Sequence, residues 1–153
     1  MTPESGFLES YLPYVLRRAD QTLSASFYAV LADGDVGRSE WRVLAVLEDL
    51  GQFSLLELAD AALSPQPTVT HAVQRLEARG LVQRTHDQRD RRVRLVSITD
   101  SGSELTRSLI AKARQLEAAA VADLADIGEL TSQLRALTEA VERQQQTQLE
   151  KGA

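Results

Sequence analysis

Residues 63–102 decide the fold and read LSPQPTVTHAVQRLEARGLVQRTHDQRDRRVRLVSITDSG. Pro67 suits the first turn of a helix, where its missing N–H does no harm, and Gly80 is a typical helix stop. Two segments rich in β-branched or alternating residues follow, residues 81–85 and residues 92–98. The polar residues 86–91 form a turn between them. Thr99 can then cap another helix. A helix, a hairpin and a second helix in this order predict a recognition helix followed by a β-wing.

The same stretch concentrates the positive charge of the chain. Residues 66–94 hold seven arginines and three acidic residues, a net charge of +4, whereas residues 1–65 sum to −6 and residues 95–153 to −3. The whole chain carries −5, so its positive field is confined to one place. The commonest partner of such a basic island is the phosphate backbone of DNA.

Composition narrows the class of protein. The 153 residues suffice for one domain, or for one domain with an added assembly element. Ala and Leu dominate and only 5% of residues are aromatic, which favours helix over sheet. The absence of cysteine excludes disulfides, thiolate metal sites and thiol redox switches. His71 and His86 do not suggest a metal site, and we expect neither a metal nor a cofactor.

Neither a secretory signal nor a membrane span is predicted. The first ten residues, MTPESGFLES, lack a basic region and a long apolar run. No apolar run approaches the roughly 18–20 residues that a membrane helix needs. We therefore expect a soluble, cytoplasmic protein without a membrane partner. Nucleophile–base pairs, phosphate loops and paired carboxylates in a recognisable frame are also lacking, so we expect no enzymatic activity.

Helical periodicity extends upstream of the recognition helix. A first helix ends near Leu31, where residues 33–35 read Asp-Gly-Asp, and its apolar residues recur at helical spacing: Leu16, Ala19, Leu23, Phe27 and Val30. A second helix begins near Arg38 and stops at Gly51, with four residues turned inward: Trp41, Leu44, Ala45 and Leu47.

A short helix and the recognition helix then form a helix-turn-helix. Residues 54–57, Ser-Leu-Leu-Glu, are a capping box that opens a short helix ending near Ala61. The recognition helix runs from Pro67 to Arg79 and turns four residues inward, at i, i+3, i+4 and i+7: Val69, Ala72, Val73 and Leu76.

Two long helices are predicted after the wing. The first follows Thr99 and includes Leu105, Leu109, Ala113, Leu116 and Ala120. The second is opened by Asp126 with Glu129, and its apolar residues from Ile127 are spaced 3, 4, 3 and 4 apart, as in a coiled coil. Four of them are the predicted homodimer interface: Leu130, Leu134, Leu137 and Val141. We expect residues 144–153 to fray.

From the first helix to about Val141 the chain resembles the MarR family of winged-helix regulators. The pieces that carry the resemblance, in the family's order and spacing, are Ser54–Ala59, Thr68-Val69-Thr70, Arg75-Leu76-Glu77, Gly80-Leu81-Val82, Arg84, Asp87, Asp90-Arg91-Arg92, Ile98-Thr99 and Gly102. The resemblance implies a mainly α fold with a small β-hairpin. A winged helix-turn-helix core, residues 37–98, would be flanked by an N-terminal dimerisation helix, residues 1–36, and C-terminal dimerisation helices, residues 99–153.

The predicted DNA contacts lie on the recognition helix and the wing. Helix-turn-helix proteins place the N-terminal part of the second helix in the major groove, where hydroxyls and amides suit base edges and arginine suits guanine. The resemblance also implies an Asp-x-Arg pair, Asp90 and Arg92, with the arginine in the minor groove and the aspartate orienting it. The candidate DNA-binding residues are Gln66, Thr68, Thr70, His71, Gln74, Arg75, Arg84, Arg89, Asp90, Arg91 and Arg92.

Several of these assignments have simpler alternatives. The outward stripe on the recognition helix could be an ordinary solvated face. Arg84 and Arg94 could pair across the hairpin, and Arg79 could complement the C-terminal end of its helix. The chain departs from the family at His71, where many members carry arginine.

The resemblance implies a sequence-specific, double-stranded DNA-binding transcriptional regulator, a homodimer on a pseudo-palindromic operator. It further implies a ligand-responsive repressor that a small aromatic or phenolic acid releases. The candidate ligand-binding residues are Arg17, Arg18, Trp41 and Arg42, since an arginine beside an aromatic ring suits a carboxylate-bearing ring. Surface arginines and a core tryptophan are the alternative.

Two other functions stay open. The chain could be a ligand-independent DNA-binding regulator, or a winged-helix protein-interaction module without a DNA role. The sequence does not identify the operator, the effector, the regulated genes, or whether the protein represses or activates.

Overall fold

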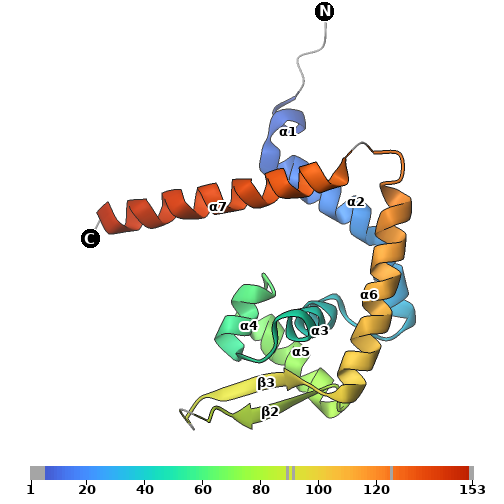
Figure 1. The fold of residues 1–153 in the computed structure, drawn as a ribbon, viewed down its shortest axis with the longest axis vertical. Coiled ribbons are helices and arrows are strands. Elements are labelled where there is room, and N and C mark those ends of the chain that lie inside the picture. Colours follow the sequence, from blue (N-terminus) through green and yellow to red (C-terminus); the bar gives the residue numbers. More distant parts are fainter. Residues whose placement is uncertain (1–5, 89, 91, 125, 152–153) are drawn as a thin grey trace, which may run out of the picture. The chain divides into compact units, whose positions relative to one another are not determined.

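A computed structural model of the chain describes residues 6–88, 90, 92–124 and 126–151 (Figure 1). The chain divides into two compact units, residues 1–117 and 118–153. The elements of the first unit are α1 (Phe7–Ser10), α2 (Leu12–Asp33), α3 (Arg38–Leu50), β1 (Phe53–Ser54), α4 (Leu55–Ala61), α5 (Gln66–Ala78), β2 (Val82–His86), β3 (Arg94–Ile98) and α6 (Asp100–Ala120), whose last residues belong to the second unit. The second unit contains α7 (Ile127–Lys151). The predicted fold class, mainly helical with a small β-hairpin, is confirmed.

The main core lies between α3, α4, α5 and the sheet. Its buried residues include Leu58 of α4, Val96 of β3 and all four residues of α5 that the periodicity turned inward, each fully buried: Val69, Ala72, Val73 and Leu76. Full burial of one stripe explains why α5 forms an amphipathic helix in spite of its two β-branched valines. The stripe also fixes which residues α5 can present to solvent.

The prediction for α3 was partly wrong. Leu44 and Leu47 are buried, but Trp41 and Ala45 are only half-buried, and Val43 is fully buried instead. Trp41 lies toward α2, where its ring meets that of Phe27 edge to face at a centroid distance of 4.9 Å. A second cluster forms there around Phe27, Leu31, Val36 and Leu109. Because α3 packs against two clusters, its buried residues lie on more than one face of the helix. A prediction that assumed one buried face was therefore incomplete.

The capping box at the start of α4 is confirmed. Glu57 N–H donates to Ser54 Oγ at 3.4 Å, and Ser54 N–H donates to Glu57 Oε2 at 2.9 Å. Strand β1 was not predicted; it pairs with β3 and makes an antiparallel sheet in the order β1-β3-β2. Two residues are too short to show a period of two. In the wing, Val82 pairs with Ile98 and His86 with Arg94.

Thr99 joins α6 to the winged-helix core. Its hydroxyl donates to Gly80 O at 2.7 Å and accepts from Gly102 N–H at 3.1 Å, so the predicted cap is present. Further along α6, Ser103 Oγ and Arg107 Nε donate to the Glu48 carboxylate of α3, at 2.6 and 2.7 Å. These contacts hold the first half of α6 against α3.

In the second unit, Asp126 caps α7, since its Oδ1 accepts from Glu129 N–H at 2.9 Å. The helix continues to Lys151, so the expected fraying from residue 144 is wrong for the described part of the tail. The unbroken run of good helix formers, glutamine included, accounts for this. None of the described residues of α7 is buried.

Candidate DNA-binding interface and effector pocket

The outward face of α5 is polar and open. Gln66, Thr68, His71 and Gln74 are all exposed. Thr70 is half-buried, and its hydroxyl donates to Gln66 O at 2.9 Å, one turn back along the helix. Its hydroxyl proton is thus already used, and Thr70 is less available to DNA than the exposed four.

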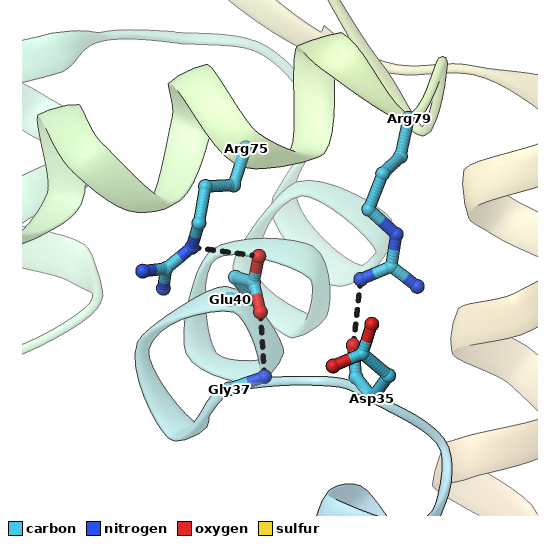
Figure 2. Close-up of polar contacts among 5 residues, drawn as sticks. All are labelled: Asp35, Gly37, Glu40, Arg75 and Arg79. Atoms are coloured by element: carbon cyan, nitrogen blue, oxygen red, sulfur yellow. Dashed lines mark hydrogen bonds and ion pairs between the residues drawn. The ribbon is translucent and has the colours of Figure 1, made fainter.

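Arg75 also lies on this helix, but its guanidinium turns toward α3. Arg75 Nε donates to Glu40 Oε1 at 3.1 Å, and the other carboxylate oxygen, Oε2, accepts from Gly37 N–H at 2.5 Å (Figure 2). The Glu40 side chain is only 6% exposed, whereas that of Arg75 is 60% exposed. One turn further along, Arg79 Nη1 donates to Asp35 O at 2.8 Å.

Glu40 was not among the predicted site residues. Its position could have indicated a helix start, because a glutamate at the third residue of a helix is the acidic half of a capping box. Its second partner, Arg75, is 35 residues away along the chain, and no local pattern predicts that contact. For Arg79, an interaction with the end of its own helix was one alternative, and its side chain bonds the turn before α3.

The wing tip is closed by main-chain and carboxylate contacts. Asp87 Oδ1 accepts from Asp90 N–H at 3.3 Å, and Asp87 N–H donates to Val93 O at 2.9 Å. Asp90 Oδ1 accepts from the main-chain N–H of Arg92 at 2.9 Å, and Arg92 is exposed. Asp90 therefore holds the backbone that carries Arg92. The candidates Arg89 and Arg91 lie outside the described residues.

Arg84 connects the wing to α5. Its Nε lies 3.3 Å from Glu77 Oε2 in an ion pair, and the arginine side chain is 23% exposed. The residue paired with Arg94 across the hairpin is His86, so Arg84 and Arg94 are not register partners. Arg84 is thus largely covered, and its ion pair with Glu77 holds the wing against α5.

Trp41 and Arg42 line a pocket of about 500 Å³ between α2, α3 and α4. Its other lining residues are Asp20, Ser24, Phe27, Tyr28, Ala45, Val46, Ala61, Ala62 and Leu63. Arg42 Nη1 donates to Ser64 Oγ at 3.4 Å, next to Pro65, which caps α5. Arg17 and Arg18 are exposed on α2 and are not among the lining residues.

The predicted seam on α7 is open to solvent. Leu130, Leu137 and Val141 are 47%, 37% and 42% exposed, and Leu134 is half-buried. Within the part of the chain that the structure describes, no helix is long and apolar enough to span a membrane. The same residues contain no group of three or more histidine, cysteine or acidic side chains that could hold a metal ion.

Comparison with known proteins places these features in one family. A sequence profile described as the MarR family matches residues 35–93. The chain is 37% identical over 103 residues to the HTH-type transcriptional repressor NicR of Pseudomonas putida, which covers 67% of this chain and 65% of that protein. The chain thus spans slightly less than two thirds of that relative.

Two solved structures are similar over most of their length. The MarR family transcriptional regulator SPO1453 from Silicibacter pomeroyi DSS-3 is 34% identical with a TM-score of 0.78, over 90% of this chain and 99% of that one. BpsR of Bordetella bronchiseptica, whose DNA binding is regulated by 6-hydroxynicotinic acid, is 29% identical with a TM-score of 0.73, over 90% and 96%.

Proposed function

The chain belongs to the MarR family, and on this premise we propose that it is a transcriptional regulator that binds double-stranded DNA with sequence specificity, as a homodimer. The observation that carries the proposal is the exposed polar face of α5 beside a basic wing, on a chain that is otherwise acidic. Relatives of this family are named as repressors. Repression is therefore the favoured direction of regulation.

In this proposal the α5 face enters the major groove. Thr68, His71 and Gln74 project from the side opposite the buried stripe, and they offer hydroxyl, imidazole and amide groups to base edges. Arg92 enters the neighbouring minor groove or contacts its phosphates, with its backbone held by Asp90. His71 would contribute less to phosphate binding than an arginine would and more to base preference.

The proposed homodimer is supported by apolar residues that the described chain leaves uncovered. The α7 seam is one such set, and another lies at the start of the chain: Phe7, Leu8, Tyr11 and Leu12. Exposed apolar surface of this kind marks protein interfaces. Residues 1–36 and 99–153 would form the dimerisation part, and residues 37–98 the DNA-binding lobe. Two lobes one helical turn apart would read a pseudo-palindrome.

We further propose that a small aromatic acid binds in the pocket lined by Trp41 and Arg42. The pocket volume of about 500 Å³ is within the range of small-molecule sites. A ligand carboxylate would accept a charge-assisted bond from Arg42 and compete with Ser64 for that guanidinium. Ser64 directly precedes the cap of α5, so the exchange would loosen the start of the recognition helix. A ligand-independent regulator is the alternative.

The DNA proposal is tested by selecting duplexes from a random pool with the purified protein. The expected result is a pseudo-palindrome with half-sites roughly 10 bp apart and an affinity that falls steeply with salt. His71→Ala and Gln74→Ala should reduce affinity for the selected duplex more than for random DNA. Failure to enrich any sequence, with no salt-dependent binding, would favour a protein-interaction module instead.

A further inference from the structure

We infer that Arg75 and Arg79 are positioning residues, which set the orientation of the recognition helix on the turn between α2 and α3 and do not read operator bases. Glu40 is the anchor of this arrangement. The inference rests on the proposed function, because it assigns roles within the DNA-binding face described above. It also removes Arg75 from the candidate base readers.

The single carboxylate of Glu40 contacts both the start of α3 and a side chain of α5. Its Oε2 accepts from Gly37 N–H and so caps α3, while its Oε1 accepts from Arg75 Nε of α5. The carboxylate is nearly removed from solvent, and an ionised group in such a place needs a charged partner. Arg75 is the ion-pair partner that the described residues provide. Its guanidinium therefore has a role within the fold before DNA arrives.

A second nitrogen of the Arg75 guanidinium, Nη2, also lies close to the turn before α3. A Cβ built on Gly37 would lie 3.3 Å from Arg75 Nη2 and 2.9 Å from Glu40 Oε2, so this terminal nitrogen of the arginine lies close to the glycine. A bidentate contact with guanine needs two parallel donors of the guanidinium aimed outward. An arginine held at Nε and packed at Nη2 is poorly placed to supply them.

Arg79 adds a second point of attachment one turn along α5. Its Nη1 donates to the carbonyl oxygen of Asp35, a non-glycine residue in the left-handed region with φ of 52°. The buried stripe of α5 already limits the rotation of the helix about its axis, and two polar contacts a turn apart on one face oppose it further. Because the exposed polar residues lie around the same axis, the roll of α5 determines which of them reach base edges.

The turn that receives these arginines also contacts the apolar cluster beside the pocket. Val36, between Asp35 and Gly37, is buried with Phe27, and Trp41 packs against the same cluster. Phe27 and Trp41 line the pocket. The attachment point of α5 is thus continuous with the pocket wall through packed side chains.

A double-mutant cycle with Glu40→Gln and Arg75→Gln tests the inference. Each single variant should bind the duplex selected by the wild type about tenfold more weakly, and the double variant no more weakly than the poorer single one. Random duplex should be affected less than threefold or so, and the slope of log K against log salt should not change. The loss of a phosphate contact would instead lower that slope by about 0.9.

Arg79→Gln is an independent arm, because it removes an exposed side chain and leaves no buried charge. It should also weaken selected over random duplex, whereas Arg114→Gln, an exposed arginine of α6, should not. The inference is overturned if Glu40→Gln binds like wild type while Arg75→Gln alone loses affinity and lowers the salt slope. It is also overturned if the two losses add.

A cycle on the free energy of unfolding, from urea titrations of the same four proteins, separates this inference from the proposed function. Non-additive destabilisation is expected even if the protein bound no DNA at all. Additive or absent effects would refute the Glu40–Arg75 link directly. Failure of the wild type to bind DNA, with the coupling present, would refute only the proposed function.

Discussion

Gly102 packs against the carbonyl group of Leu81, where a Cβ built on the glycine would lie 2.0 Å from the carbonyl oxygen. The first turn of α6 can therefore approach the start of β2 only because residue 102 has no side chain. The neighbouring Thr99 donates its hydroxyl to Gly80 O in the same junction. The orientation of α6 on the winged-helix core depends on this close approach.

Gly102→Ala should destabilise the protein by about 1–3 kcal/mol, since the clash is with backbone and cannot be relieved by a side-chain rotation. The free energy of unfolding from urea titration measures this. Gly128→Ala, at the start of α7, is the matched control, because its Cβ would have an ordinary contact of 3.4 Å with Asp126 Oδ1. Alanine favours helix there, so equal destabilisation by both variants would contradict the explanation.

The stability should also depend on pH through Glu48. Hydrogen bonds from Ser103, and then from Arg107, hold the pKa of Glu48 below its ordinary value of 4.5. A carboxyl group with a lowered pKa in the folded state stabilises the fold above its unfolded pKa, and this contribution is lost as the pH falls through the folded pKa. The advantage of wild type over Glu48→Gln should therefore be full at neutral pH and shrink below pH 4.5.

Unfolding titrations of wild type and Glu48→Gln at a series of pH values test this prediction. Glu104→Gln, an exposed residue of α6, serves as the control for the loss of one carboxylate. A stability difference between wild type and Glu48→Gln that stays constant down to the acid limit would show that the contacts with Ser103 and Arg107 do not depend on the charge.

Features that depend on local chemistry were predictable from the sequence. The four buried residues of α5 follow from one helical period, and the bounds of α4 follow from the capping box at Ser54 and Glu57. In both cases the relevant atoms lie within a few residues of each other. Local propensity and burial agree there, so nothing in the tertiary structure overrides the pattern.

Contacts between distant segments were not predictable in the same way. Glu40 and Arg75 are brought together by the packing of α3 on α5, and a single sequence contains no pattern that links them. The same limit applies to Arg42, which was predicted as a ligand residue together with Arg17 and Arg18. The three arginines can be distinguished only in the folded structure. Arg42 lines the pocket, whereas Arg17 and Arg18 are exposed on α2 and do not line it.

Leu134→Asp should convert the predicted homodimer into monomers at micromolar concentration. A charge that is placed in an apolar interface without a partner costs several kcal/mol, which is enough to dissociate most small dimers. Ser132→Asp, on an exposed position two residues away and on another side of α7, should remain dimeric. Sedimentation velocity decides between them, and a monomeric wild type would refute the interface itself.

Arg92→Ala should weaken binding to selected and random duplexes by similar factors, because a minor-groove or phosphate contact carries little base information. Asp90→Ala should have the same effect in weaker form, since it frees the backbone of Arg92 without removing its charge. Gln88→Ala, exposed at the same tip, should bind normally. If Arg92→Ala lost only specific binding in mobility-shift titrations, the wing would have to be assigned to base recognition.

The last prediction concerns the pocket. A small aromatic carboxylate such as a benzoate should weaken binding to the selected duplex, and a typical coupling of ~1–3 kcal/mol corresponds to roughly 5–150-fold. Arg42→Gln lacks the contact with Ser64, so it should bind the duplex more weakly than wild type even without ligand. It should show no further response, because it cannot pair with the carboxylate, whereas Arg17→Gln should respond like wild type. Fluorescence of Trp41, the only tryptophan, reports ligand binding without DNA.

Thermodynamic linkage requires DNA to weaken the affinity for the ligand by the same factor. A response that survives in Arg42→Gln and disappears in Arg17→Gln would move the ligand site out of this pocket. A panel of benzoates without effect on either signal would favour a ligand-independent regulator.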